Sequence, residues 1–177
     1  MKLVVLDRDG VINLDSDQYI KSPEEWTPIP GSLEAIARLT QAGFRVAIAT
    51  NQSGLARGLF DMAKLNAMHN KMHKAVNQLG GRIDAVFFCA HAQDAGCACR
   101  KPQPGMLLEI AERYGIALAD VPVIGDSLRD LQAASAAGAR PMLVLTGKGE
   151  KTLKAGGLPQ GTVVHQDLAA AALALTT

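Results

Sequence analysis

Two aspartates stand two residues apart behind the first apolar run of the chain. Residues 4–13 read VVLDRDGVIN, so the run ends in Asp7, Arg8, Asp9 and Gly10. Carboxylates this close repel one another unless a cation neutralises them or a reaction uses them. Carboxylate oxygens select Mg²⁺, which also binds phosphate oxygens. The stretch therefore indicates a divalent cation and phosphoryl chemistry.

Polar groups of matching chemistry occur at three later points of the chain. Hydroxyl and amide groups can bind a phosphoryl group, and Lys and Arg balance its charge. Each of the three motifs alone is more often a turn or a helix start. Their succession along the chain favours one common site. They are Thr50, Asn51, Gln52 and Ser53, then Arg100 and Lys101, then Asp126 with Ser127 and Asp130.

All three cysteines lie in the segment FFCAHAQDAGCACRKP. Cys89, His91, Cys97 and Cys99 form a CxH…CxC set, and three thiolates with one imidazole make a closed structural zinc site. The alternative is a reduced surface loop that carries cysteines by accident. We expect zinc, which would hold the backbone that leads into Arg100 and Lys101.

Short apolar runs alternate with helical patterns along the whole chain. This order predicts an α/β fold, with a doubly wound parallel sheet and helices on both faces. In such sheets ligands lie beyond the carboxyl ends of the strands. Ser32 and Asp61 are expected to cap the first two helices, and Pro104 to start the third. The predicted strands are residues 2–6, 44–49, 83–88, 121–125, 141–145 and 162–165, and a last helix is expected from Leu168.

Composition limits the class of protein. The 177 residues are 48% hydrophobic and carry a net charge of +1, so we expect one domain over residues 1–177 and no nucleic-acid partner. No apolar run is long enough to span a membrane. An acid at position 7 interrupts the first apolar run, which argues against a signal peptide. We therefore expect a cytoplasmic protein, and a monomer.

The sequences LDRDGVI, ATNQSG, RKP and IGDSLRD resemble the four ordered motifs of the haloacid dehalogenase-like (HAD) phosphatases. The resemblance covers nearly the whole chain. It implies that Asp7 is the nucleophile and that Asp9 is the general acid and base. It also implies that Thr50 binds the phosphoryl group and that Lys101 stabilises its charge, with further cationic support that we expect from Arg100.

The same resemblance implies a magnesium site. Its ligands would be the Asp7 carboxylate, the Asp9 backbone carbonyl and the Asp126 carboxylate. Asp7 would attack phosphorus to give an aspartyl phosphate. Asp9 would protonate the leaving alkoxide and then take a proton from water, which favours hydrolysis. Ser127 departs from several relatives, which have lysine there, so Lys101 would be the main cation.

The zinc loop narrows the resemblance to one branch of this family. The motifs are similar to those of the small capless sugar bisphosphate phosphatases of bacterial heptose biosynthesis, which supplies lipopolysaccharide or S-layer precursors. This implies removal of the 7-phosphate of a heptose 1,7-bisphosphate. Histidinol-phosphate phosphatases are the alternative. The intervals between the motifs leave no room for a separate lid domain.

Loop residues would select the substrate. The segment DSDQYIKSPEEWTPIP follows the first motif, and by the resemblance Asp15 and Tyr19 contact the substrate. Arg57 could meet a distal phosphate or be a structural arginine. Firmer phosphate contacts are expected from Thr50, Asn51, Gln52 and Ser53 and from Arg100 and Lys101.

Two readings outside catalysis stay open. The chain could bind a phosphosugar without turning it over, or its zinc loop could be an interaction module. His69 and His73 are one helical turn apart but have no evident third metal ligand, so we interpret them as a polar helix face.

Overall fold

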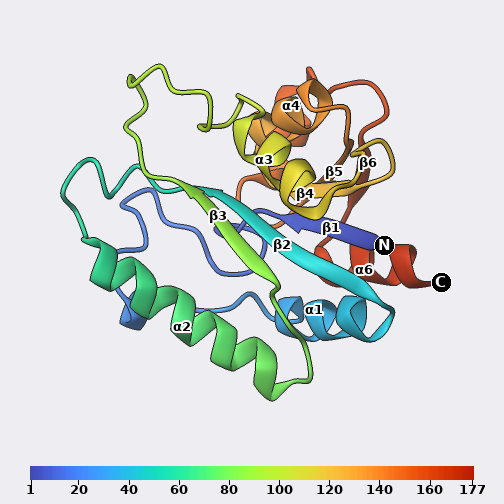
Figure 1. Ribbon diagram of the computed structural model, residues 1–177, viewed down its shortest axis with the longest axis horizontal. Helices are drawn as coiled ribbons and strands as arrows, with labels where there is room; N and C mark the ends of the chain where they lie inside the picture. The colour runs from blue at the N-terminus through green and yellow to red at the C-terminus, as the bar shows by residue number, and fades with distance from the viewer.

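The computed structural model describes residues 1–177, with a six-stranded sheet between two layers of helices (Figure 1). The strands are β1 (Lys2–Leu6), β2 (Phe44–Asn51), β3 (Ala85–Cys89), β4 (Pro122–Gly125), β5 (Arg140–Val144) and β6 (Val163–His165). The helices are α1 (Ser32–Gln41), α2 (Met62–Gln78), α3 (Gly105–Tyr114), α4 (Leu128–Ala136), α5 (Gly149–Ala155) and α6 (Leu168–Thr176), with a 3₁₀ turn η1 (Pro23–Glu25).

All strand pairs are parallel, and the strand order is β3-β2-β1-β4-β5-β6. From β1 the sheet extends through β2 and β3 on one side, and through β4, β5 and β6 on the other. Val5 therefore pairs with Ala47 on one side and with Val123 on the other. Loops that follow β1 and β4 diverge at this point, which leaves a crevice where ligands bind in doubly wound folds.

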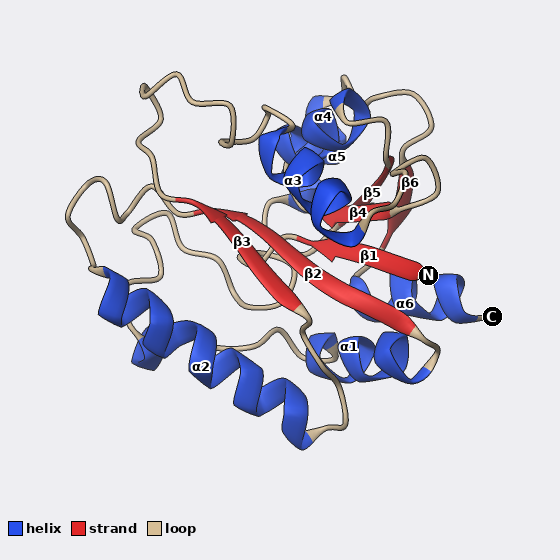
Figure 2. Ribbon diagram, viewed as in Figure 1, coloured by secondary structure: helices blue, strands red, loops and turns tan.

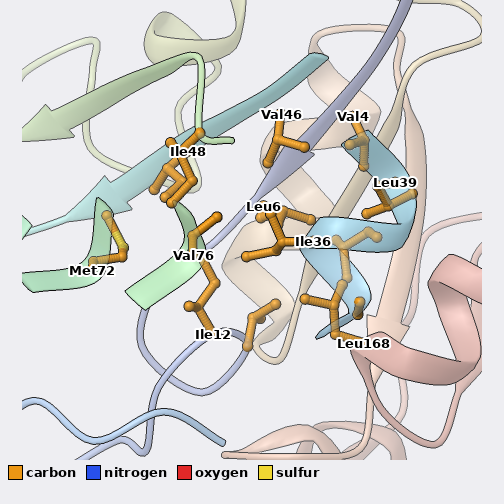
Figure 3. Packing of buried hydrophobic residues seen from close by; sticks show 14 of the residues in the cluster. Val4, Leu6, Ile12, Ile36, Leu39, Val46, Ile48, Met72, Val76 and Leu168 are labelled. Carbon is orange, nitrogen blue, oxygen red and sulfur yellow. The ribbon is translucent and has the colours of Figure 1, made fainter. Parts of the chain in front are cut away.

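Two hydrophobic clusters fill the layers, because alternate residues of each strand point to opposite faces. Val4 and Leu6 of β1 enter the cluster under α1, α2 and α6, whereas Leu3 and Val5 enter the cluster under α3 and α4. Figure 2 shows the helices on both sides of the sheet. Figure 3 shows the first cluster, where Ile36 and Leu168 from two different helices approach Leu6.

The predicted order of strands and helices is confirmed, with boundaries that differ by one or two residues at most strands. Asp61 caps α2, since its carboxylate accepts a hydrogen bond from the Lys64 backbone at 2.9 Å. The prediction for Ser32 is wrong. Gly31 is the N-cap of α1, and the Ser32 hydroxyl instead donates to the carbonyl of Val11, which ties the first motif to this helix.

Two short elements were not predicted. Helix α5 has few apolar residues and follows a glycine-rich turn, so it lacks the periodicity that identifies a helix in sequence. The 3₁₀ turn η1 is only three residues long. No separate lid lies between β1 and β3, where the chain forms only η1, α1, the sheet strand β2, α2 and loops. None of the helices combines the length and the apolar character that crossing a membrane needs.

Candidate active site

The predicted motifs meet at the carboxyl ends of the strands. In Figure 1 the loops that follow β1, β2 and β3 lie on the side toward which the strand arrows point. A cavity of about 220 Å³ opens there and is lined almost entirely by polar and charged side chains. Of the predicted residues, its lining includes Asp7, Asp9, Asp15, Tyr19, Thr50, Asn51, Ser53, Arg100, Lys101, Asp126, Ser127 and Asp130.

A buried lysine joins the first and fourth motifs. The Nζ of Lys101 lies 3.1 Å from Asp7 Oδ1 and 2.7 Å from Asp130 Oδ1, and donates to the carbonyl of Ala49 at 2.8 Å. Burial alone would lower the pKa of Lys101, but Asp130 and Asp7 outweigh it and hold this pKa above its ordinary value. Lys101 therefore stays charged and immobile next to Asp7.

Both carboxylate oxygens of Asp130 accept hydrogen bonds from neighbouring groups. Its Oδ2 accepts from the backbone of Asp126 at 3.2 Å and from the backbone and hydroxyl of Ser127 at 3.1 and 2.9 Å. Lys101 occupies the other oxygen. The pKa of Asp130 is lowered because Lys101 and these hydrogen bonds outweigh the effect of burial. The sequence contains a signal for this role, the Ser127-x-x-Asp130 pattern of a helix start.

The carboxylates of Asp7 and Asp126 fit a divalent cation. Oxygens of Asp7, Asp126 and Asp130 lie within 4.8 Å of one another. Burial, followed by the charge of Asp130, raises the pKa of Asp7 to about 7, and burial with the charge of Asp7 raises the pKa of Asp126 to about 8. A bound cation would relieve this repulsion. Both oxygens of Asp130 are already occupied by Lys101 and by the Asp126–Ser127 turn. Asp7 and Asp126 are therefore the carboxylates available to bind a cation.

Two glycines bring the loops around Asp126 together. Gly10 has φ +85°, and a Cβ there would lie 2.0 Å from Asp126 Oδ2. Gly147 has φ +56°, and its Cβ would lie 2.3 Å from the same oxygen. The adjoining Lys148 backbone donates to Asp126 Oδ2 at 2.9 Å. Gly10 therefore does more than turn the chain, since its missing side chain makes room for Asp126.

Asp9 is held at one oxygen and open at the other. Its Oδ1 accepts from Arg8 Nε at 2.8 Å and from Asn13 Nδ2 at 2.9 Å, whereas Oδ2 receives only the longer contact of 3.3 Å from Gln52. Burial disfavours the charged form, but Arg8 and these hydrogen bonds outweigh it and lower the pKa of Asp9. Asp9 is thus a fixed carboxylate that can exchange a proton at Oδ2.

The four residues of the second motif divide into two groups. Thr50 and Ser53 line the cavity. Gln52 is buried and bridges Thr50 Oγ1 at 3.0 Å and Asp9, so it positions other groups and does not line the cavity. Asn51 lines the cavity and also exchanges hydrogen bonds with the Lys101 backbone at 3.0 and 3.3 Å. These contacts connect the second motif to the third.

The predicted substrate loop reaches the cavity. Asp15 pairs with Lys148 at 3.6 Å, and Tyr19 accepts a hydrogen bond from Gln93 at 3.1 Å. Ser53 and Gln93 beside its hydroxyl lower the pKa of Tyr19. Arg57 does not line the cavity. Its guanidinium donates to Gln93 at 3.1 and 3.2 Å and lies over the Tyr19 ring, 5.8 Å from the centroid.

Three cations besides Lys101 line the cavity: Arg100, Arg129 and Lys148. Arg100 was predicted, whereas Arg129 and Lys148 were not. The Nη1 of Arg100 is buried without a hydrogen-bond partner, and burial with the nearby charge of Arg129 lowers the pKa of Arg100. Lys148 follows a strand in the sequence TGKG, so the rule that ligands bind at strand ends could have identified it. Arg129 is inside a helix, where an exposed arginine carries no such signal.

Cys89, His91, Cys97 and Cys99 converge on one point. Their ligand atoms lie within 4.8 Å of one another, and four of the five close separations are between 3.2 and 3.7 Å. Tetrahedral zinc with bonds of about 2.3 Å requires separations close to these. The Cys89–Cys99 distance of 2.6 Å is shorter, and all three cysteines are free thiols. The donor set and its placement therefore fit a metal.

The interpretation of His69 and His73 as a polar helix face is wrong for His69. That ring is buried, and its Nε2 lies 3.2 Å from Nη1 of Arg8. The hydrophobic stripe of α2 gave no sign of this partner, because Arg8 belongs to a loop that is 61 residues away in the chain.

Comparison with known families places the chain among phosphatases. A model described as polynucleotide kinase 3 phosphatase matches residues 2–128, and a HAD-hydrolase-like model matches residues 98–171. The D-glycero-beta-D-manno-heptose-1,7-bisphosphate 7-phosphatase of Bordetella bronchiseptica is 66% identical over 172 residues, covering 97% of this chain and 96% of that protein. The protein of the same name from Pseudomonas aeruginosa is 56% identical, covering 98% and 97%.

Solved structures agree with the sequence comparisons. The crystal structure of D,D-heptose 1,7-bisphosphate phosphatase from B. bronchiseptica, complexed with magnesium and phosphate, has a TM-score of 0.98 at 65% identity and covers 99% of this chain and 98% of that one. The corresponding enzyme from Burkholderia thailandensis has a TM-score of 0.80 at 62% identity, with the same coverage.

Proposed function

The chain belongs to the HAD-like hydrolases, in the family of bacterial heptose-1,7-bisphosphate 7-phosphatases, and from this we propose that it removes the 7-phosphate of D-glycero-D-manno-heptose 1,7-bisphosphate. One observation in this structure supports the proposal independently of the family match. Asp7 lies in a polar cavity, 3.1 Å from the buried cation of Lys101, and Asp9 stands two residues on, with one oxygen held only by the 3.3 Å contact to Gln52. A nucleophile, a charge stabiliser and a proton carrier therefore share one site.

In the proposed first step Asp7 attacks phosphorus, the phosphorus–alkoxide bond breaks, and an aspartyl phosphate forms. Asp9 donates a proton to the departing alkoxide. The pKa of Asp9 is low in the free protein, so it must first take up a proton. The negative charge of an incoming phosphoryl group favours this uptake, because it opposes the charged carboxylate.

In the second step Asp9 accepts a proton from water, which attacks phosphorus and releases Asp7 and phosphate. Its ordinary ionised form suits this role. Thr50 and Ser53 would donate to the phosphoryl oxygens, while Lys101 and Arg100 balance their charge. The partnerless Nη1 of Arg100 supports such a contact.

We propose that Asp7, the Asp9 carbonyl and Asp126 hold Mg²⁺. When bound, this ion would neutralise phosphoryl charge and the two carboxylates. The raised pKa values of Asp7 and Asp126 support a cation there, as does the magnesium in the Bordetella structure.

We propose that Cys89, His91, Cys97 and Cys99 hold a structural zinc ion. Four protein ligands leave no position for a reacting water, so zinc would not take part in the chemistry. Its role would be mechanical, because Cys99 directly precedes Arg100 and Lys101. The ion would fix the backbone from which both cations extend.

The substrate loop and the cationic mouth suit a second charged group on the sugar. We propose that Asp15 and Tyr19 contact sugar hydroxyls, and that Asn51 and Gln52 position Lys101 and Thr50. Arg57 would act through Tyr19 and Gln93, since it does not line the cavity.

We also propose a monomer, for which light scattering should give a mass near 18.6 kDa.

Phosphate release with Mg²⁺ tests the substrate. The panel should contain heptose 1,7-bisphosphate, histidinol phosphate and, because of the family model, a DNA oligonucleotide with a 3′-phosphate. We expect the largest kcat/KM for the heptose bisphosphate. A larger value for either of the other two would overturn the substrate assignment.

Asp7→Asn tests the chemistry. The amide cannot form the aspartyl phosphate, so we expect kcat to fall by at least about a thousandfold. Circular dichroism and the melting temperature should show that the fold remains. Hydrolysis at the wild-type rate would refute Asp7 as the nucleophile.

A further inference from the structure

Arg8 stands between the two aspartates of the first motif but points away from the cavity. Its side chain is completely buried, and Arg8 is absent from the cavity lining. Two contacts hold the guanidinium, with Nε 2.8 Å from Asp9 Oδ1 and Nη1 3.2 Å from His69 Nε2. The remaining nitrogen, Nη2, has no partner. Asp9 and His69 are thus the only hydrogen-bonding partners of this guanidinium.

The guanidinium is rigid and planar, so fixing Nη1 also fixes the direction of Nε. Without His69, Arg8 would keep one contact at the end of a flexible side chain. His69 can fill this role only with a free lone pair on Nε2. Burial and the charge of Arg8 lower the pKa of His69 to about 4, so the ring stays neutral at ordinary pH and can accept the hydrogen bond.

We propose that His69 is a positioning residue for Asp9, acting through the guanidinium of Arg8. The inference rests on the proposed role of Asp9 as general acid and base. Helix α2 would in this way hold Asp9 Oδ1 in place, while Oδ2, which receives only the 3.3 Å contact from Gln52, can take the proton.

The test separates leaving groups that need a proton from one that does not. In forming the aspartyl phosphate, a sugar alkoxide needs the proton of Asp9, whereas p-nitrophenolate leaves without it. His69→Met removes the acceptor at similar volume, and His69→Asn keeps polarity but is too short to reach Arg8. For both variants we expect kcat/KM for the heptose bisphosphate to fall about tenfold, and that for p-nitrophenyl phosphate to change less than about twofold.

His69→Gln supplies an amide oxygen near the position of Nε2 and should restore most of the loss. His73→Met is the matched control, because His73 lies one turn further along α2 and makes no side-chain hydrogen bond. Melting temperatures identify any variant that fails to fold, and the kcat/KM values of the remaining variants then test the positioning role.

Equal losses on both substrates, or no rescue by Gln, would overturn the positioning role and show a merely structural one. Unchanged kcat/KM for the heptose bisphosphate in His69→Met and His69→Asn would overturn it as well. A wild-type chain that releases phosphate from neither substrate would instead refute the proposed function, and this inference with it.

Discussion

At the scale of single residues, the site depends on charges that are buried together. Lys101 is paired with both Asp7 and Asp130, and none of the three side chains is freely exposed. Removing one member of a buried group leaves the others uncompensated, which costs more than the group contributes when whole. Asp130 lines the cavity but touches no substrate in the proposed mechanism, and it is nevertheless as necessary as the residues that do.

Asp130→Asn should lower the free energy of unfolding by about 3 kcal/mol, because it leaves Lys101 with one carboxylate. Urea unfolding measures this. Lys21→Gln breaks the exposed pair between Lys21 and Glu25, 3.4 Å apart, and should cost less than about 1 kcal/mol. Similar losses in the two variants would contradict the importance of the buried pair.

Gly10→Ala should disturb the cation site. The new Cβ would meet Asp126 Oδ2 at 2.0 Å, so this carboxylate must move. We expect the Mg²⁺ concentration for half-maximal activity to rise about tenfold. Gly43→Ala is the matched control, since Gly43 has φ +90° with nothing within 4 Å of the added carbon. It should lose about 1 kcal/mol of stability through backbone strain and keep its Mg²⁺ dependence.

At the scale of elements, loops and helix starts place the reactive groups, while the sheet supplies a fixed base. Cys89 ends β3, and the loop that follows it contains the other three ligands, His91, Cys97 and Cys99, before it reaches Lys101. Asp130 lies in the first turn of α4, and the backbone of Lys148 in the turn before α5 donates to Asp126. Helix α2 supplies His69 to the first motif. Each of these segments therefore contacts the site through residues that can be identified.

Removing zinc should loosen the loop after β3 without unfolding the sheet. Cys97→Ser should bind less than the expected zinc of about one per chain, and its kcat should fall at least about tenfold because Arg100 and Lys101 lose their anchor. Metal analysis, far-ultraviolet circular dichroism and turnover in excess Mg²⁺ check this. Full activity in a zinc-free protein would contradict the mechanical role.

At the scale of the whole molecule, cation binding and stability are linked through pH. Unfolded aspartates ionise near their ordinary pKa of 3.8, whereas Asp7 and Asp126 of the metal-free fold have pKa values of about 7 and about 8. The fold therefore holds protons that the unfolded chain has lost. Stability that depends on those protons is lost as pH rises through the folded pKa values.

In Mg²⁺-free buffer the free energy of unfolding should fall by about 1 to 2 kcal/mol between about pH 7 and about pH 8.5. Saturating Mg²⁺ should remove most of this decline, since the cation stabilises the ionised carboxylates. Urea unfolding at each pH, with zinc retained, measures both. Asp126→Asn should flatten the metal-free profile. A stability that rises over this range without Mg²⁺ would contradict the raised pKa values.

The sequence by itself determined the order of strands and helices, because hydrophobic periodicity is a local property. It also determined which strand ends carry polar groups, and therefore the membership of most of the cavity, from Asp7 to Asp126. The cysteine and histidine spacing indicated a metal loop, and the side chains do converge.

Only the tertiary structure decided which of these groups touch. Arg8 and His69 are 61 residues apart, and Lys101 and Asp7 are 94 residues apart, so no local pattern could join them. The approach of Gly10 and Gly147 to Asp126 likewise depends on how three strand-end loops meet. Periodicity reports which face of an element is buried, whereas the partner of a buried charge is set by packing between distant segments.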